Sequence, residues 1–253
     1  MRRLAAHAGW MAVLALLVAA WQAYVRLRGV PQYVLPAPSD VARTLWDERR
    51  ALASAAGVTA REMLAGFAVA LAFGLSAAVA LHSSGTLRRA VYPLLVASQS
   101  VPVVAIAPIL VIYLGFGLAP KLLIIALVCF FPITVGALDG FRSVDPEHVR
   151  VMRTLRASRA GIFRRVELPW ALPSIFTGMR VAASYAAVAA LFAEYAGADS
   201  GLGNAMREGT GQYDAPLVGA AVVVLAALAL ALFGAVTLAE RLIAPWARRV
   251  ESR

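Results

Sequence analysis

Apolar residues fill six long stretches of the chain, and most charged residues stand in the segments between them. Each stretch is close to the ~20 residues that a helix needs to cross a bilayer. We therefore predict an all-α membrane protein with six transmembrane helices. The predicted spans cover approximately residues 9–25, 60–82, 91–114, 119–140, 176–197 and 216–240.

A basic, amphipathic segment separates the fourth and fifth predicted spans. Its apolar residues recur at helical spacing, and arginines occupy the positions between them. This pattern predicts two short helices, each with an apolar edge and an arginine-rich face. Two interpretations remain open. The segment is a docking site for another protein, or it is a surface helix that arginines hold at the lipid headgroups. The apolar positions are Val149, Met152, Leu155, Ile162, Phe163 and Val166.

Composition agrees with a membrane protein and argues against a soluble enzyme. The chain has 253 residues, 61% of them hydrophobic and only 15% charged, whereas soluble domains average ~25% charged residues. The net charge is +10, but the chain has no recognisable nucleic-acid-binding motif, so we expect no nucleic-acid partner. Basic loops in membrane proteins more often reflect topology and contact with anionic lipid.

The distribution of arginine predicts the orientation of the chain. If the N-terminus lies inside, the inner segments hold 15 basic residues and the outer segments hold 8. Cytoplasmic loops carry an excess of basic residues. We therefore expect both termini and the basic loop to lie in the cytoplasm.

Polar residues interrupt the third predicted span. Ser98, Gln99 and Ser100 stand among three prolines in one apolar run. Proline leaves backbone carbonyls without partners, and at membrane depth such groups need a neighbouring helix or a water-lined cavity. These three residues therefore line a translocation route, or they only bond neighbouring helices; the sequence leaves both possibilities open.

No residue pattern supports catalysis or nucleotide binding in this chain. Lys121 is the only lysine, and no glycine-rich phosphate-binding motif surrounds it. Any ATP and Mg²⁺ would therefore bind another polypeptide. The histidines are too scattered to suggest a metal site, and no hydrolase motif occurs. We expect a transport subunit that is not itself an enzyme, with no catalytic residue, metal or cofactor of its own.

The end of the basic segment, Val166-Glu167-Leu168-Pro169, stands ten residues after Arg156. This arrangement resembles the cytoplasmic "EAA" loop of ABC-importer permeases. Ser200-Gly201-Leu202-Gly203 after the fifth span also resembles that family. In the family the loop forms a coupling helix that sits in a groove of a separate ATPase subunit.

The first half of the family motif is absent. Its Glu-Ala-Ala would fall on residues 150–152, and its glycine would fall on Arg156. The resemblance implies a coupling loop over residues 142–175. Its candidate ATPase-coupling residues are Val149, Met152, Leu155, Arg156, Ala157, Ser158, Ile162, Phe163, Val166, Leu168 and Pro169.

The resemblance also implies an architecture, a mechanism and partners. Residues 1–253 would form a single permease domain, a bundle like that of type I ABC importers, in the bacterial cytoplasmic (inner) membrane. Alternating access would be driven by two cytoplasmic ATPase subunits that carry the ATP and Mg²⁺. The other partners would be a second copy of the chain, a periplasmic or lipid-anchored substrate-binding protein and membrane lipid.

In that family the fifth span lines the pore together with the third. Ser184 and Tyr185 are then further candidates for the translocation pathway. Glu194, near the outer end of the same span, is either a gating or binding carboxylate or a solvated group at the interface. We favour the solvated interpretation.

Several segments, including residues 35–38, 97–102 and 129–132, resemble the permease group for sulfonates, nitrate, taurine and thiamine-pyrimidine precursors. The similarity points to a thiamine-precursor pyrimidine or a related aromatic heterocycle as the solute, with a sulfonate, taurine or nitrate as the alternative. An ion-coupled secondary transporter is a weaker alternative, because it would need ionisable residues at mid-membrane and the sequence places essentially none there.

Overall fold

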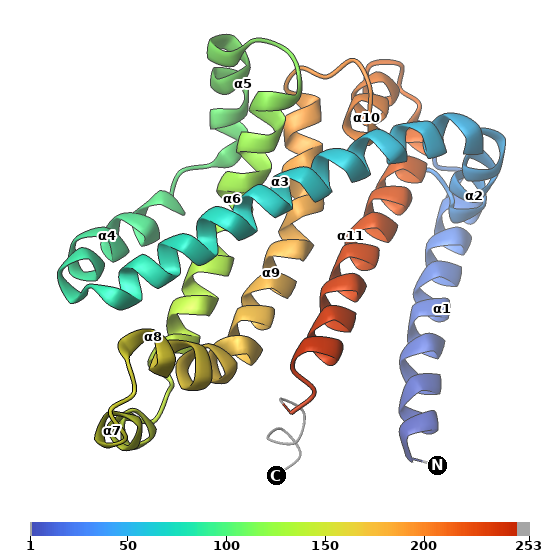
Figure 1. Ribbon diagram of the computed structural model, residues 1–253. Helices are drawn as coiled ribbons and strands as arrows, with labels where there is room; N and C mark the ends of the chain where they lie inside the picture. Colours follow the sequence, from blue (N-terminus) through green and yellow to red (C-terminus); the bar gives the residue numbers. More distant parts are fainter. Residues whose placement is uncertain (1, 247–253) are drawn as a thin grey trace.

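The computed structural model describes residues 2–246, and within that range the secondary structure is entirely helical (Figure 1). This agrees with the all-α prediction. The elements, in chain order, are α1 (Arg2–Arg28), α2 (Pro38–Asp47), α3 (Arg49–Ser83), α4 (Gly85–Ser98), α5 (Val103–Leu114), α6 (Leu118–Arg142), α7 (Pro146–Thr154), α8 (Arg159–Ile162), the π-helix η1 (Phe163–Glu167), α9 (Leu168–Tyr195), α10 (Leu202–Gly211) and α11 (Ala215–Ile243).

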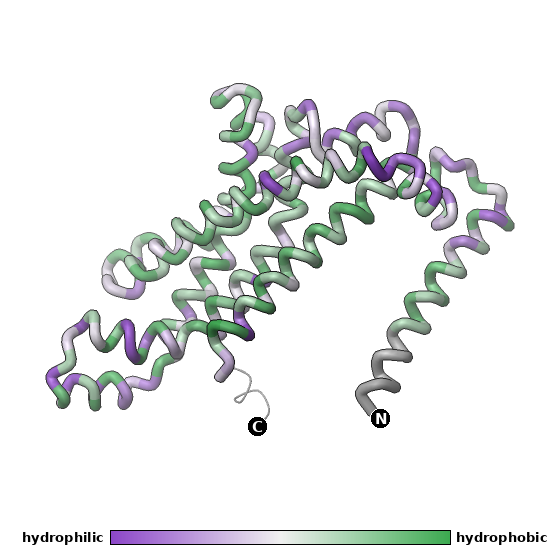
Figure 2. Tube along the Cα trace, turned by 45° about the vertical axis from the view of Figure 1, so that its right-hand side comes forward, coloured by the Kyte–Doolittle hydropathy of each residue, from purple (hydrophilic) through white to green (hydrophobic). Residues whose placement is uncertain are grey.

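Five helical segments in the described range are long and apolar enough to cross a membrane. They are α1, α3, α6, the continuous segment Arg159–Tyr195, and α11. The predicted six spans are therefore not all present as continuous helices. Hydrophobic residues dominate the long helices, while hydrophilic residues concentrate toward their ends and in the connections (Figure 2).

The prediction of one span over residues 91–114 is wrong. Helix α4 ends at Ser98, a turn follows, and α5 begins at Val103. Pro102 lacks a backbone N–H, and Ser98 turns its hydroxyl back to the carbonyl of Leu95 at 2.7 Å. Both features favour the end of a helix. At 14 and 12 residues, α4 and α5 are each about 20 Å long, shorter than the ~30 Å hydrocarbon core.

The helix that contains the fifth predicted span begins before residue 176. Helix α9 begins at Leu168 and continues η1 and α8 without a break, so helix occupies much of the expected 142–175 loop. Pro169 stands in the first turn of α9, where the missing N–H of proline costs nothing. The prolines at the end of the loop therefore belong to the helix.

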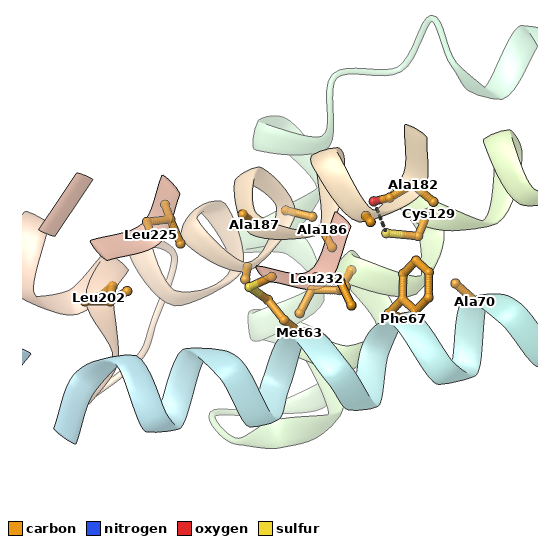
Figure 3. Packing of buried hydrophobic residues seen from close by; sticks show 14 of the residues in the cluster. Met63, Phe67, Ala70, Cys129, Ala182, Ala186, Ala187, Leu202, Leu225 and Leu232 are labelled. Atoms are coloured by element: carbon orange, nitrogen blue, oxygen red, sulfur yellow. Dashed lines mark hydrogen bonds between the residues drawn. The ribbon is translucent and has the colours of Figure 1, made fainter. Parts of the chain in front are cut away.

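Small residues allow α3, α6 and α9 to pack closely. Gly178 of α9 lies against the backbone of α6, and a β-carbon there would collide with the carbonyl oxygen of Pro132. Such close approach is typical of helix contacts in membranes. Figure 3 shows Met63, Phe67 and Ala70 of α3 facing the alanines of α9. The thiol of Cys129 donates to the carbonyl of Ala182 at 3.4 Å within this core, and the cysteine is fully buried there.

The two ends of the bundle differ in what they carry. The beginning of α1, the end of α11 and the short helices α7 and α8 lie toward one end, and α2, α5 and α10 lie toward the other (Figure 1). Helix α1 stands apart from the bundle, and most of the residues in its apolar window are exposed. We refer below to the two ends as the α7 end and the α10 end.

Candidate functional site: the α7–α8 loop and the α10 clasp

The α7–α8 loop, residues 143–167, begins with a defined helix start. The carboxylate of Asp145 accepts the backbone N–H of Glu147 at 2.8 Å, and Pro146 occupies the first helical position. Both features stabilise a helix N-terminus. Helix α8 begins in the same way, because the hydroxyl of Ser158 accepts the N–H of Gly161 at 3.1 Å. The two short helices predicted from the apolar pattern are present, although the second is the start of the long helical segment.

Arg156 takes a left-handed backbone conformation, with a φ of 55°. Around it, the N–H of Ala157 donates to the carbonyl of Met152 at 3.0 Å and the N–H of Arg156 to that of Arg153 at 2.9 Å. These two bonds form a Schellman motif, whose left-handed position usually holds glycine. Arg156 is also the position at which the resembling family has its glycine. The backbone thus keeps the turn although the glycine is lost.

Two contacts fix the rear of the loop to the end of α3. Nε2 of His82 lies 3.1 Å from a carboxylate oxygen of Glu167, and the guanidinium of Arg159 donates to the carbonyl of Ser83 at 3.0 Å. The ring of Phe163 packs on Phe141 with centroids 5.4 Å apart. Helix α8 and η1 are therefore anchored on the bundle.

The candidate coupling residues divide into an inner and an outer set. Ile162 is buried, and Val149, Met152, Ala157, Phe163, Val166, Leu168 and Pro169 are partly buried. Leu155, Arg156 and Ser158 are exposed, and Leu155 is the most accessible apolar side chain among them, at 71%. Val151, which the apolar pattern did not single out, is 57% exposed on α7. The apolar surface that the loop offers to a partner is therefore Val151 with Leu155, and Phe163 faces the core.

The candidate pathway residues lie on two separate surfaces. Ser98, Gln99 and Ser100 are all exposed at the turn between α4 and α5. Ser184 and Tyr185 are exposed on α9, where the Ser184 hydroxyl bonds the carbonyl of Arg180 in its own helix. Among the bonds found in the described range, none joins the turn to α9. Their role as a pathway stays a prediction.

The expectation that Glu194 is solvated is wrong, because α10 folds over the end of α9 and leaves this carboxylate 0% exposed. One oxygen accepts the hydroxyl of Thr59 at 2.6 Å, and the other accepts the N–H of Gly203 at 2.6 Å. The Thr59 oxygen in turn accepts the N–H of Leu202 at 2.9 Å. These bonds connect α3, α9 and α10, and we call Thr59, Glu194, Leu202 and Gly203 the α10 clasp.

The α10 clasp explains the Ser-Gly-Leu-Gly sequence in physical terms. Gly201 has a φ of 110°, and a β-carbon there would collide with the carboxylate of Glu194. A β-carbon at Gly203 would lie 2.8 Å from Cβ of Glu194. Glycine is required at both positions because the carboxylate occupies the space of the missing side chains.

The sequence reasoning missed a buried ion pair. Nζ of Lys121 on α6 lies 2.6 Å from Oε1 of Glu62 on α3, and the two side chains are 10% and 6% exposed. Glu62 stands one helical turn after Thr59, so both lie on one face of α3. The sequence did contain a sign of this pair. Glu62 and Lys121 each stand beside a long apolar run, and an ionisable residue in such a place usually pairs with another group.

Comparison with known proteins identifies relatives over most of the chain. The formylaminopyrimidine transport permease protein of Halalkalibacterium halodurans is 33% identical over 92% of this chain and 94% of its own length. The riboflavin transport system permease protein of Chloroflexus aurantiacus is 35% identical over 94% and 90%. The taurine transport system permease protein of Escherichia coli is 33% identical over 94% of this chain and 89% of its own length.

A solved structure shows the same fold. The crystal structure of an amino acid ABC transporter with histidines matches with a TM-score of 0.62 at 15% identity, covering 78% of this chain and 96% of that chain. Residues 70–249 match the family described as binding-protein-dependent transport system inner membrane component. The matched residues include α6, the α7–α8 loop, α9, α10 and α11. The chain belongs to this family and is the permease component of a binding-protein-dependent ABC importer.

Proposed function

We propose that the α7–α8 loop is the coupling element of this importer and docks on a separate ATPase subunit, which holds ATP and Mg²⁺. The observation that carries the proposal is the division of the loop into an anchored rear and an exposed apolar front. His82 and Arg159 hold the rear on α3, whereas Val151 and Leu155 are 57% and 71% exposed in the part of the chain that the structure describes. An exposed apolar pair on a loop whose rear is anchored supports a protein contact.

The docking proposal is tested with two matched valine substitutions. Val151→Asp places a charge on the exposed face of α7, and Val34→Asp places the same charge at a position of similar exposure, 62% against 57%, in the connection between α1 and α2. We expect Val151→Asp to lose the co-purifying ATPase and ATP-driven uptake, and Val34→Asp to retain the ATPase. Full recovery of the ATPase with the Val151→Asp chain would refute the proposal. Phe163→Asp is a poorer test because Phe163 packs on Phe141.

The assembly that we propose contains two copies of this chain, two ATPase subunits and an external substrate-binding protein. The family is binding-protein-dependent, which supports the last of these partners. The exposed apolar surface of α1 and the exposed polar residues on α9 support contact with a second copy and with lipid. In this arrangement the α7 end and both termini face the cytoplasm, and the α10 end faces the binding protein.

The proposed solute is a thiamine-precursor pyrimidine or a related aromatic heterocycle. The formylaminopyrimidine and riboflavin permeases support this class, and the taurine permease supports the sulfonate alternative. The experiment is co-purification of the binding protein with the tagged chain, followed by thermal-shift measurements with hydroxymethylpyrimidine, riboflavin and taurine. Stabilisation by taurine and by neither heterocycle would overturn the first choice.

Within the pore we propose that Ser98, Gln99 and Ser100, together with Ser184 and Tyr185, contact the moving solute. All five side chains are exposed in the single chain. Residues that line a pore formed between two copies of the chain must be exposed in this way. Gln99→Ala is expected to reduce uptake and solute-stimulated ATPase activity. If both stay unchanged, Gln99 does not line the route. We do not include Glu194 among these candidates, because both oxygens of its carboxylate accept hydrogen bonds within the α10 clasp.

A further inference from the structure

A pocket of about 810 Å³ lies between the beginning of α9 and the end of α11. It is on the α7 end of the bundle, where the two helices come close to the basic loop (Figure 1). Residues from α7, η1, α9 and α11 contribute to its walls. Val166 and Pro169 of the candidate coupling residues line this pocket, but the proposed docking pair, Val151 and Leu155, and the proposed pathway residues do not.

The pocket is basic. Arg165, Arg180 and Arg241 line it, and His148 stands at its wall. Glu240 is the only acidic residue among the described residues of the lining, and it is paired with Arg180. Among the side chains that the structure describes, Arg165 and Arg241 have no carboxylate within ion-pair distance. Within residues 2–246 the site therefore presents two positive charges without an acidic partner, and a guanidinium binds phosphate oxygens through two parallel hydrogen bonds.

The rest of the lining is amphipathic. Trp170 and Trp246 are 47% and 45% exposed beside the arginines, and tryptophan is enriched at the level of the lipid headgroups. Along α11, Phe233 and Leu230 are exposed one and two turns before Thr237, which lines the pocket. Helical spacing places these three residues on one face. An apolar track therefore leads from the arginines toward the middle of the membrane.

We propose that this pocket binds the headgroup phosphate of an anionic phospholipid. The arginines bind the phosphate, the tryptophans lie at headgroup level, and an acyl chain follows the apolar face of α11. Basic pockets between membrane helices are known to hold such headgroups. A soluble anion would use the arginines but not the apolar track. Because Arg165 belongs to the anchored loop and Arg241 to α11, the lipid would join the coupling element to the last helix.

The test uses the full-length chain in nanodiscs of phosphatidylcholine that contain a small fraction of phosphatidylglycerol, with native mass spectrometry as the readout. The variant Arg165→Gln/Arg241→Gln removes the two unpaired charges. The control Arg89→Gln/Arg150→Gln removes two exposed arginines outside the pocket. We expect the pocket variant to bind phosphatidylglycerol roughly 30-fold more weakly, and the control to bind nearly as well as the unaltered chain.

Four outcomes would overturn the proposal. The first is equal loss in both double variants, which would mean diffuse attraction to the basic surface. The second is equal binding of phosphatidylcholine and phosphatidylglycerol. The third is displacement of the lipid by millimolar inorganic phosphate, which would assign the site to a soluble anion.

The fourth is occupation by protein. A Trp246→Cys chain that cross-links to the ATPase subunit in the assembled transporter would show that an acidic protein segment fills the pocket. Cys129 is fully buried, so the introduced cysteine would be the reactive one. If the glutamine pair fails to fold, Arg165→Lys/Arg241→Lys keeps the charges and is expected to retain part of the preference for phosphatidylglycerol.

Discussion

The α10 clasp makes a quantitative prediction about Thr59. Replacing Thr59 by valine keeps the shape of the side chain but removes a hydroxyl that is 0% exposed. That hydroxyl donates to Glu194 at 2.6 Å and accepts the N–H of Leu202 at 2.9 Å. In the Thr59→Val chain both groups lose a partner at once, and Glu194 and Leu202 are each 0% exposed.

The expected loss follows from the cost of unsatisfied buried groups. Each such group costs about 1–3 kcal/mol, so two cost about 2–6 kcal/mol. For a chain of this size, 1 kcal/mol corresponds to about 2–4 °C in Tm, and the Thr59→Val protein should therefore melt about 4–24 °C lower. The matched control is Thr59→Ser, which keeps the hydroxyl and removes only a methyl group, a loss of roughly 1 kcal/mol.

The assay is thermal unfolding of the detergent-solubilised protein, followed by size-exclusion chromatography of the fraction that remains monodisperse. The informative quantity is the difference in Tm between Thr59→Val and Thr59→Ser. Any destabilisation that follows from every substitution at this position is common to both variants and does not affect that difference. If Thr59→Val and Thr59→Ser melt within about 2 °C of each other, the hydroxyl contributes little and the account of the clasp is wrong.

Three further predictions concern other positions and share this assay. Arg156→Gly should raise stability by about 0.5–1 kcal/mol, because relief of the left-handed conformation exceeds the entropy that glycine loses; a lower Tm would show that Arg156 is not strained. Gly203→Ala should destabilise α10, because its β-carbon meets Glu194, whereas Gly211→Ala, which has open space in the same helix, should be neutral or stabilising. Lys121→Met should cost about 3–5 kcal/mol by leaving Glu62 charged and unpaired, and Lys121→Met/Glu62→Met should recover most of that loss. A double variant as unstable as the single one would contradict this explanation.

Hydropathy predicted most of the long helices because it is an average over about 20 residues, which is the length of a helix that crosses a membrane. It failed over residues 91–114, where the composition is apolar but Pro102 and the polar turn end one helix and start another. It also did not show that the helix of the fifth span continues toward the N-terminus, beyond residue 176. Arginines, prolines and a glutamate lower the mean hydropathy before residue 176, yet the backbone there is helical from Arg159 onward.

The candidate site was only partly predictable for a different reason. The apolar spacing of the loop is local, and it correctly predicted two short helices. Which side chains face the bundle depends on contacts with α3 and α6. The spacing therefore showed neither that Val151 is exposed nor that Phe163 packs on Phe141. The bond between Thr59 and Glu194 joins residues 135 positions apart in the chain. A pattern along the sequence reports that a carboxylate is present, but not that another helix covers it.

The same two helices hold both functional ends of the molecule. Helix α3 carries Thr59 of the clasp and His82 of the loop anchor, about 35 Å apart along the helix axis. Glu167 and Glu194, the partners of these two residues, are separated by about 40 Å along η1 and α9. A displacement of the α7–α8 loop therefore acts on α3 and α9 together, and packed helices move as rigid bodies rather than bending. We infer that α10 follows the loop only while the clasp is closed. On this reasoning the Thr59→Val chain, assembled with its ATPase, should still hydrolyse ATP but import less solute per ATP. Unchanged stoichiometry would show that the α10 end is driven by another route.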